Sequence, residues 1–389
     1  MQAIGDENNK KIFDTSGEIS LENEDELNKL EYLGEDSAPV FQSVRVTKKD
    51  FSIYELYRKY NVKKQLILDV DFQRNTVWTP KQKCELIESI LMGLPLPIFY
   101  FKQQNNSTYV VVDGKQRLST LFEFLDNKFT LKSLKILKFL NGKKFKDLVD
   151  DFGIYQSQIE DYQVYSHVIL PPTPDKILFD IFDRVNRGGT KLNKQEIRNA
   201  LYHGKGLNMI TAVAASEEFE KATRIEYKKD SRMKGTYLIT RFLAFYLLFN
   251  DLLKKEGQRY EYTGDIDDLI EITLIQLNKS SLDDLEQLAQ ITIDSLKLSS
   301  EILERGAFRR DLNESKPINM NIFETTVYFM SMVVKRNNDI SENEMRTGLR
   351  KIFCDNKFLN YIGNSRDNII KVRGRFEMMN DLFEEISND

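Results

Sequence analysis

The spacing of apolar residues changes about halfway along this chain, and that change constrains the fold most. Between residues 41 and 205, short β-branched and aromatic runs alternate with segments whose apolar residues recur three and four apart. Beyond residue 206 the strand signals almost vanish, and Leu, Ile and Phe recur at helical spacing. The sequence therefore predicts an α+β fold, with an α/β domain at 41–205 and an all-α domain at 206–389.

The first 40 residues differ from the rest of the chain in charge. They hold eleven Asp and Glu against three Lys, a balance of −8, whereas the remainder carries +4. Such an acidic segment with Gly and Ser predicts a mobile leader at 1–40, although residues 21–33 could form a short acidic helix. The mildly basic body permits contact with nucleic acid without requiring it.

Composition excludes several classes of protein. Hydrophobic residues make up 41% and charged residues 30%, which rules out a wholly disordered chain. No apolar run approaches the roughly 18 residues of a membrane span, and the N-terminus lacks a signal-peptide pattern. We therefore expect a cytoplasmic protein with no membrane partner. The two cysteines, Cys84 and Cys354, cannot supply a disulfide framework or a Cys-rich zinc site.

Histidine is equally scarce. His167 and His203 are too few and too far apart for an HExxH site or the core of an HNH nuclease. His167 lies in the apolar run 164–170, and we interpret it as a hydrogen-bonded strand residue rather than a catalyst.

Turn and cap residues place the elements of the α/β domain. Thr79 is a plausible N-cap with Pro80 in the first turn and Gly93 as the stop. The polar residues 103–107 separate two β-rich runs, which is typical of a hairpin. In the Lys-rich segment 131–140 we favour a solvated face over a Leu-rich core rather than a phosphate-binding surface. Helices are expected at 51–60, 80–92, 115–125, 175–186 and 193–203, and strands at 66–68, 97–101, 108–112 and 162–170.

The segment Asp113-Gly-Lys-Gln-Arg117 is the most informative for chemistry, because it stands where an apolar strand ends and a helix begins. Gly114 allows a sharp turn and a close approach of the backbone to a ligand. The first N–H groups of the helix then form an anion site, where Arg117 can grip phosphate or carboxylate. Asp113 can hold a hydrated metal ion or orient a water. The alternative is that Asp113 is only an N-cap and Arg117 a surface salt bridge.

Further motifs flank this segment in a distinctive order. Phe72-Gln73-Arg74 and Trp78 precede it, and the segments 182–190 and 192–200 follow it. In order and spacing the chain resembles the N-terminal domain of GmrSD-type modification-dependent restriction systems, the DGQQR proteins with a ParB/sulfiredoxin-like core. The resemblance is strong over residues 45–205 and weaker beyond.

The resemblance implies roles for individual residues. The family's DGQQR loop is associated with nucleotide binding and hydrolysis and with DNA nicking or cleavage, which makes Asp113, Gln116 and Arg117 candidate catalytic residues. Lys115 replaces a family Gln, which either strengthens triphosphate binding or weakens hydrolysis by removing a water-orienting amide. The candidate nucleotide- or phosphate-binding residues are Gln73, Arg74, Gly114, Lys115, Asn186 and Gly189, and Asp113 is a candidate metal ligand.

Structural alternatives exist for several of these positions. The Gly-rich turn at 187–190 can simply end one helix and cap the next. Trp78 is interpreted as a core anchor rather than a base-stacking platform. Glu196 and Arg198 can be ordinary exposed helix charges, although Glu196 lies within the segment that resembles the family.

Two hypotheses for function follow. The first is an NTP-dependent DNA nickase or nuclease, or an NTPase, of a prokaryotic anti-phage system that uses ATP or GTP with Mg²⁺. DNA would be held by basic residues at 221–234 and 366–375. The second is a non-catalytic nucleotide- or DNA-sensing regulator that recruits a partner nuclease. Full-length family members add an HNH-like domain that supplies histidine, and no histidine follows His203.

Overall fold

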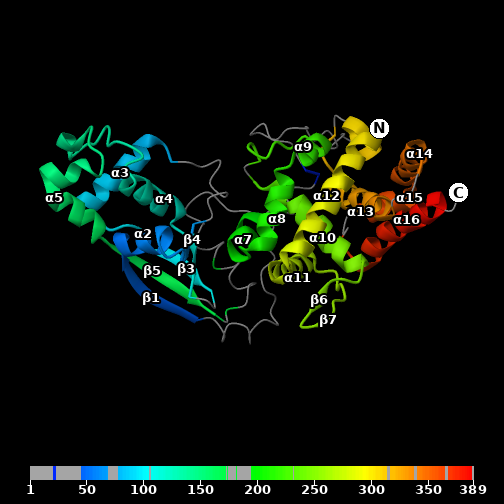
Figure 1. Ribbon diagram of the computed structural model, residues 1–389, viewed down its shortest axis with the longest axis horizontal. Coiled ribbons are helices and arrows are strands. Elements are labelled where there is room, and N and C mark those ends of the chain that lie inside the picture. The colour runs from blue at the N-terminus through cyan, green and yellow to red at the C-terminus, as the bar shows by residue number, and fades with distance from the viewer. Residues whose placement is uncertain are drawn as a thin grey trace, which may run out of the picture. The chain divides into compact units, whose positions relative to one another are not determined.

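The structure is a computed structural model, and by internal contacts the chain divides into two units (Figure 1). We call residues 29–201 the sheet unit, and residues 1–28 with 202–389 the helical unit. The structure describes residues 21–22, 45–68, 78–104, 107–171, 173, 181, 194–230, 232–312, 316–336, 340–363 and 367–387.

A mixed five-stranded sheet organises the sheet unit, in the order β1-β5-β3-β4-β2. Strands β1 and β5 pair antiparallel, as do β3 and β4, whereas β5–β3 and β4–β2 are parallel. The predicted hairpin is confirmed by the β3–β4 pairing. The strands are β1 (Arg45–Ser52), β2 (Leu66–Ile67), β3 (Phe99–Gln103), β4 (Tyr109–Asp113) and β5 (Gln163–Leu170).

Helices α2 to α5 lie on one side of this sheet in Figure 1 and enclose an aromatic core. The caps form where the sequence places them. Ser52 accepts a hydrogen bond from the N–H of Glu55, Thr79 and Gln82 form a capping box, and Gly93 follows α3 with φ +69°. The helices of the unit are α2 (Ile53–Asn61), α3 (Pro80–Leu91), α4 (Lys115–Leu125), α5 (Asp147–Glu160) and α7 (Lys194–Leu201).

One strand and one α-helix of the sheet unit were not predicted, β1 and α5. The side chains of residues 45–50 are all exposed, so β1 shows no alternation of buried and exposed positions over this part. It forms because it pairs along its whole length with β5, more than 100 residues away. The predicted helix at 175–186 lies largely outside the described residues.

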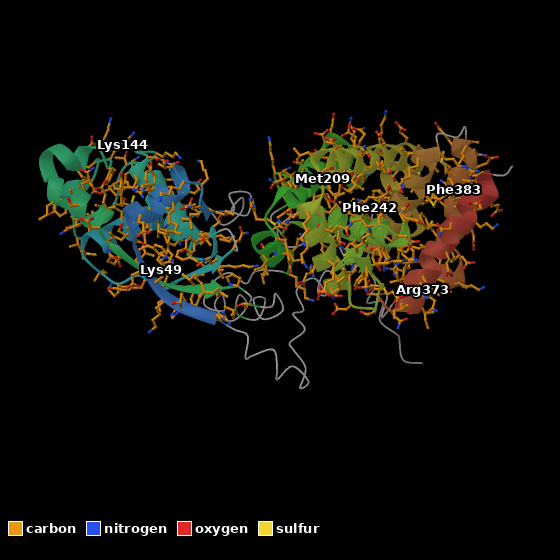
Figure 2. The ribbon with its side chains drawn as sticks, turned by 60° about the horizontal axis from the view of Figure 1, so that its bottom comes forward. Lys49, Lys144, Met209, Phe242, Arg373 and Phe383 are labelled. Atoms are coloured by element: carbon orange, nitrogen blue, oxygen red, sulfur yellow. The ribbon has the colours of Figure 1, made fainter. Side chains whose placement is uncertain are left out.

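The helical unit packs around α10, which is buried along nearly its whole length. Phe242 of this helix lies in the interior of the unit (Figure 2). None of the described helices is long and apolar enough to cross a membrane. The helices are α8 (Lys205–Ala214), α9 (Glu217–Thr223), α10 (Lys234–Phe249), α11 (Ile266–Lys279), α12 (Leu282–Leu303), α13 (Met320–Arg336), α14 (Glu342–Phe353), α15 (Asn356–Tyr361) and α16 (Ile369–Ser387).

A small hairpin departs from the expected all-α composition of this region. Strands β6 (Lys254–Lys255) and β7 (Gln258–Arg259) pair antiparallel across a two-residue turn. Both turn residues, Glu256 and Gly257, have positive φ angles. Positive φ at both central positions is the geometry of a type I′ turn, which suits the twist of the flanking strands.

Four charged side chains meet inside the helical unit, and we call them the arginine–carboxylate network. Arg241 donates to Glu324 at 2.9 Å and to Asp367 at 2.8 Å. Arg375, which is fully buried, donates to the other oxygen of Glu324 at 2.5 Å. Two arginines and two carboxylates are thus neutralised together in the core.

The predicted mobile leader is described only at Leu21 and Glu22, and both residues are docked on the helical unit. Leu21 is 2% exposed and forms a parallel bridge with Ile318, whose carbonyl accepts a hydrogen bond from the N–H of Glu22 at 2.8 Å. The Glu22 carboxylate accepts from Nε of Arg310 at 2.7 Å and from Asn319. At these two positions the segment is held against the fold, contrary to the expectation of mobility. Residues 23–44 lie outside the described residues.

Candidate functional site

A glycine turn joins β4 to α4 and sets the geometry of the candidate site. Gly114 has φ +98° and is the N-cap residue of α4. A Cβ atom at this position would lie 2.2 Å from Cδ1 of Phe99 on β3, so the backbone passes too close for any side chain. Both facts require glycine, because L-residues are strained at this φ and the contact leaves no room.

Asp113 and Arg117 stand on either side of this turn and form an ion pair. Nη2 of Arg117 donates to Oδ2 of Asp113 at 2.8 Å, and its Nη atoms also reach the carbonyl oxygens of Pro97 and Ile98. The guanidinium carbon lies 4.1 Å from the ring centroid of Phe99. Arg117 is therefore 9% exposed and held on several sides.

The alternative assignments for these two residues are wrong. Gly114, not Asp113, is the N-cap, and no side chain caps the helix. The salt bridge is not a surface pair, since the side chain of Arg117 is nearly buried and that of Asp113 is half-buried. Oδ1 of Asp113 makes no hydrogen bond among the described residues, so one carboxylate oxygen remains open beside the turn.

Electrostatics at the turn leave the arginine incompletely compensated. Burial lowers the pKa of Arg117, and the charge and hydrogen bond of Asp113 offset this only in part. An additional anion near the guanidinium would stabilise its charged form. This property suits a group meant to meet a phosphate or carboxylate.

The first turn of α4 adds donors and one orphaned acceptor. Its early N–H groups have no partner within the helix, and no acidic side chain occupies the first turn. Lys115 is buried at this position. Oε1 of Gln116 is buried and accepts no hydrogen bond among the described residues. A buried amide oxygen without a donor calls for a partner such as a water or ligand hydroxyl.

A row of polar side chains crosses the sheet from Asp113, and sequence reasoning missed it. Asp113 lies opposite Tyr100 at a β-bulge, Tyr100 opposite His167, and His167 opposite Lys48. The Tyr100 and His167 rings stack with centroids 5.4 Å apart. His167 is a strand residue, as expected, but its ring stacks and makes no hydrogen bond among the described residues. The pairing register, which a single sequence does not reveal, brings these residues together.

Helix α7 packs against β4 and buries an unusual number of polar residues. Glu196 and Arg198 are buried, so the interpretation of them as exposed helix charges is wrong. Nε2 of Gln195 donates to Asn199 at 2.7 Å, whereas Oε1 of Gln195 is buried without a partner among the described residues. Burying polar groups costs free energy unless they are paired, so these side chains form a polar cluster inside the sheet unit.

Several predicted site residues lie outside the described residues. These are Gln73 and Arg74 before α3, and Asn186 and Gly189 before α7. Their proposed roles stay predictions. Trp78 is described, and it packs against the core of the sheet unit, in agreement with its interpretation as an anchor.

Several basic residues in the two segments predicted to hold DNA are paired or buried. Lys221 and Lys229 pair with neighbouring glutamates at 3.0 and 2.7 Å, and Lys234 is buried. Arg375 lies inside the arginine–carboxylate network. Arg373 remains exposed on α16 (Figure 2). Lys234 and Arg375 are buried and so are not exposed to a DNA backbone, whereas Lys221, Lys229 and Arg373 are exposed. The assignment of the two segments to DNA binding stays a prediction.

Within the described part of the chain, no three His, Cys, Asp or Glu side chains gather closely enough to hold a metal ion. The assignment of Asp113 as a metal ligand stays a prediction.

Comparison with known proteins gives one family match. Residues 53–203 match the family model of the GmrSD restriction endonuclease, N-terminal domain, a range that contains the Asp113–Arg117 turn and α7. No curated protein and no solved structure gives a significant match. The sheet-containing region of this chain, residues 53–203, belongs to the GmrSD restriction endonuclease N-terminal domain family.

Proposed function

We propose that this chain binds and hydrolyses ATP or GTP at the Asp113–Arg117 turn, as a component of a prokaryotic anti-phage restriction system that nicks or cleaves DNA. Family membership supports the restriction role. The observation that carries the nucleotide assignment is the nearly buried Arg117, paired with Asp113 beside the N-terminus of α4, where no acidic side chain occupies the first turn. Phosphate is the anion that such a turn suits best.

The residues at the turn fit a nucleotide phosphate. Gly114 permits the tight turn that starts α4 with φ +98°, and Lys115 and Arg117 supply positive charge. Gln116 offers an amide oxygen that can position a water. Mg²⁺, where bound, would neutralise phosphate charge, and the open oxygen of Asp113 is the group able to hold it.

We also infer that the sheet unit has a ParB/sulfiredoxin-like core. A mixed sheet with helices α2 to α5 on one face supports this inference, as does the strand–Gly–helix turn after β4. In such a core the polar row from Asp113 to Lys48 and the buried helix α7 would flank one ligand site.

A second function has one observation in its favour. The guanidinium of Arg117 already donates hydrogen bonds to Asp113 and to two carbonyl groups, as that of a purely structural arginine would. Under this alternative the turn senses nucleotide or DNA without turnover, and a partner nuclease makes the cut.

An NTP hydrolysis assay on the purified full chain, with and without DNA, separates the two functions. We expect phosphate release from ATP or GTP that Asp113→Asn abolishes. Nucleotide binding without turnover in the wild type would favour the regulator. Absence of both binding and turnover would contradict the assignment of the turn to nucleotide.

A further inference from the structure

The most basic stretch of the chain lies away from the glycine turn, between α4 and α5. Residues 127–146, which we call the lysine loop, contain seven lysines and no acidic residue. Leu131, Leu134 and Leu140 are buried beneath it, which confirms the Leu-rich core. The phosphate-binding role that the sequence pattern did not favour is the one that the exposed side chains of this segment support. The lysines are Lys128, Lys132, Lys135, Lys138, Lys143, Lys144 and Lys146.

A buried glutamate holds the backbone of this loop in place. The carboxylate of Glu88, on α3, accepts hydrogen bonds from the N–H groups of Ile136 at 2.8 Å, Leu137 at 2.9 Å and Lys135 at 3.3 Å. Burial alone would raise the pKa of Glu88, but these three donors lower it on balance. The fold therefore holds the backbone of the lysine loop in a defined conformation at these three residues.

This fixed loop displays two large apolar side chains to solvent. Ile136 is 66% exposed and Phe139 is 52% exposed, and each directly follows a lysine. The Phe139 ring lies 6.1 Å from the ring of Tyr155 on α5. Both side chains leave much of their apolar surface in water, which burial against a partner would remove. A loop that is held in place and exposes two large apolar side chains within four residues presents a contact surface.

Positive charge around these side chains is available to a partner. Lys132, Lys138 and Lys146 are exposed and form no ion pair among the described residues. Lys135 pairs with Glu85 at 3.3 Å, with both side chains exposed to solvent. Figure 2 shows Lys144 on the side of the sheet unit where the helices lie.

We propose that the lysine loop binds duplex DNA, with its lysines on phosphates and with Ile136 and Phe139 against the minor groove. Lysine is depleted in protein–protein interfaces, whereas it is a main source of phosphate contacts. Apolar side chains flanked by cations are typical of minor-groove contacts. The choice of DNA as partner rests on the proposed function in restriction. The location of the surface rests instead on the exposed lysines and apolar side chains of the loop.

Helix α4 fixes the distance between this surface and the glycine turn. Its eleven residues start at the turn and end just before the lysine loop. At about 1.5 Å per residue the helix spans roughly 16 Å, which is about five base pairs of duplex. A duplex of about 30 base pairs bound at the lysine loop is longer than this separation.

The test compares two triple variants of the full chain in the absence of nucleotide. Lys132→Gln/Lys138→Gln/Lys146→Gln removes the free lysines of the loop. Lys279→Gln/Lys297→Gln/Lys357→Gln removes three exposed lysines of the helical unit and is matched in charge. Fluorescence anisotropy on a duplex of about 30 base pairs, between roughly 50 and 200 mM salt, gives affinity and salt dependence.

We expect the lysine-loop variant to bind on the order of 10- to 100-fold more weakly and to lose about 2–3 from the slope of log K against log salt. The matched control should change affinity by less than about threefold. Phe139→Ser should weaken binding about three- to tenfold with an unchanged slope, since it removes no charge. Unchanged melting temperatures will exclude unfolding.

Equal losses in both triple variants would overturn the proposal. So would tighter binding to the matching single strand, or no DNA binding by the wild type. Because nucleotide is absent, failure of nucleotide binding at the glycine turn leaves this result unaffected, and the two proposals fail separately.

Discussion

The two units both bury arginine, and they compensate its charge differently. In the helical unit Arg241 and Arg375 share Glu324 and Asp367, so two cations face two anions. Burial would lower the pKa of Arg241, but the charges of Asp367 and Glu324 more than reverse this, and its pKa is raised well above the ordinary value. In the sheet unit Arg117 has Asp113 alone, and its pKa is lowered.

This difference separates a structural charge cluster from a candidate binding site. In the arginine–carboxylate network two cations and two anions balance one another, so its net charge attracts no further ion. A buried cation with a single half-buried partner still favours an additional anion. The surroundings agree, because the pair lies at an open helix N-terminus beside an orphaned amide oxygen.

The largest expected effect comes from the same substitution made in both units. Asp113 and Asp367 each accept from an arginine at 2.8 Å. We expect Asp113→Asn to lower NTP turnover on the order of 10²–10⁴-fold, because the variant keeps the shape and loses the charge that positions water or Mg²⁺. Asp367→Asn should leave turnover unchanged and lower the melting temperature instead. Full turnover in a folded Asp113→Asn protein would remove Asp113 from the catalytic set.

Glu324→Gln should cause the largest loss of stability. It leaves two buried arginines with Asp367 alone, and we expect the free energy of unfolding of the helical unit to fall by about 3–5 kcal/mol. Denaturant titration measures this, with Glu385→Gln on the exposed face of α16 as the control, expected to change it by less than about 0.5 kcal/mol. A loss below about 1 kcal/mol would show that the network is not the stabilising cluster that the comparison assumes.

Arg117→Ala should weaken nucleotide binding about ten- to a hundredfold, because a charge-assisted phosphate contact is worth roughly 1.5–3 kcal/mol. Calorimetric titration with ATP and GTP gives the affinities. Arg117→Lys keeps the cation without the two-pronged geometry, so it should recover part of the loss. Unchanged affinity in a folded Arg117→Ala protein would assign the arginine to structure alone.

The smallest effect is expected from removing the N-terminal segment, whose Glu22 pairs with Arg310. Deleting residues 1–40 removes this pair and the buried Leu21, and should lower stability by about 1–2 kcal/mol. It also removes a charge of −8, which should raise non-specific DNA binding at low salt. Leu21→Ser, which keeps the charge, should reproduce only the stability loss. An unchanged melting temperature after truncation would show that the docking contributes nothing.

Local signals predicted much of the sheet unit. Thr79 precedes α3 as its N-cap and Gly93 follows its end, both as expected. The turn at Gly114 joins the strand and the helix that the spacing of apolar residues indicated. These features depend on neighbours within a few residues, so the chain itself carries them. The burial of Glu196 and Arg198 was not foreseen, because helical periodicity does not tell which polar faces a distant strand will cover.

What the sequence by itself determined is the chemistry at the turn: a glycine between an aspartate and an arginine at a strand–helix junction, within a family recognised by motif order. The tertiary structure alone decided the environment of those groups. It placed Phe99 under the guanidinium, aligned Tyr100 and His167 with Asp113, and set Glu88 beneath the lysine loop. These contacts join residues far apart in the chain. These contacts depend on long-range strand pairing and on burial, and the local spacing of apolar residues predicts neither of the two.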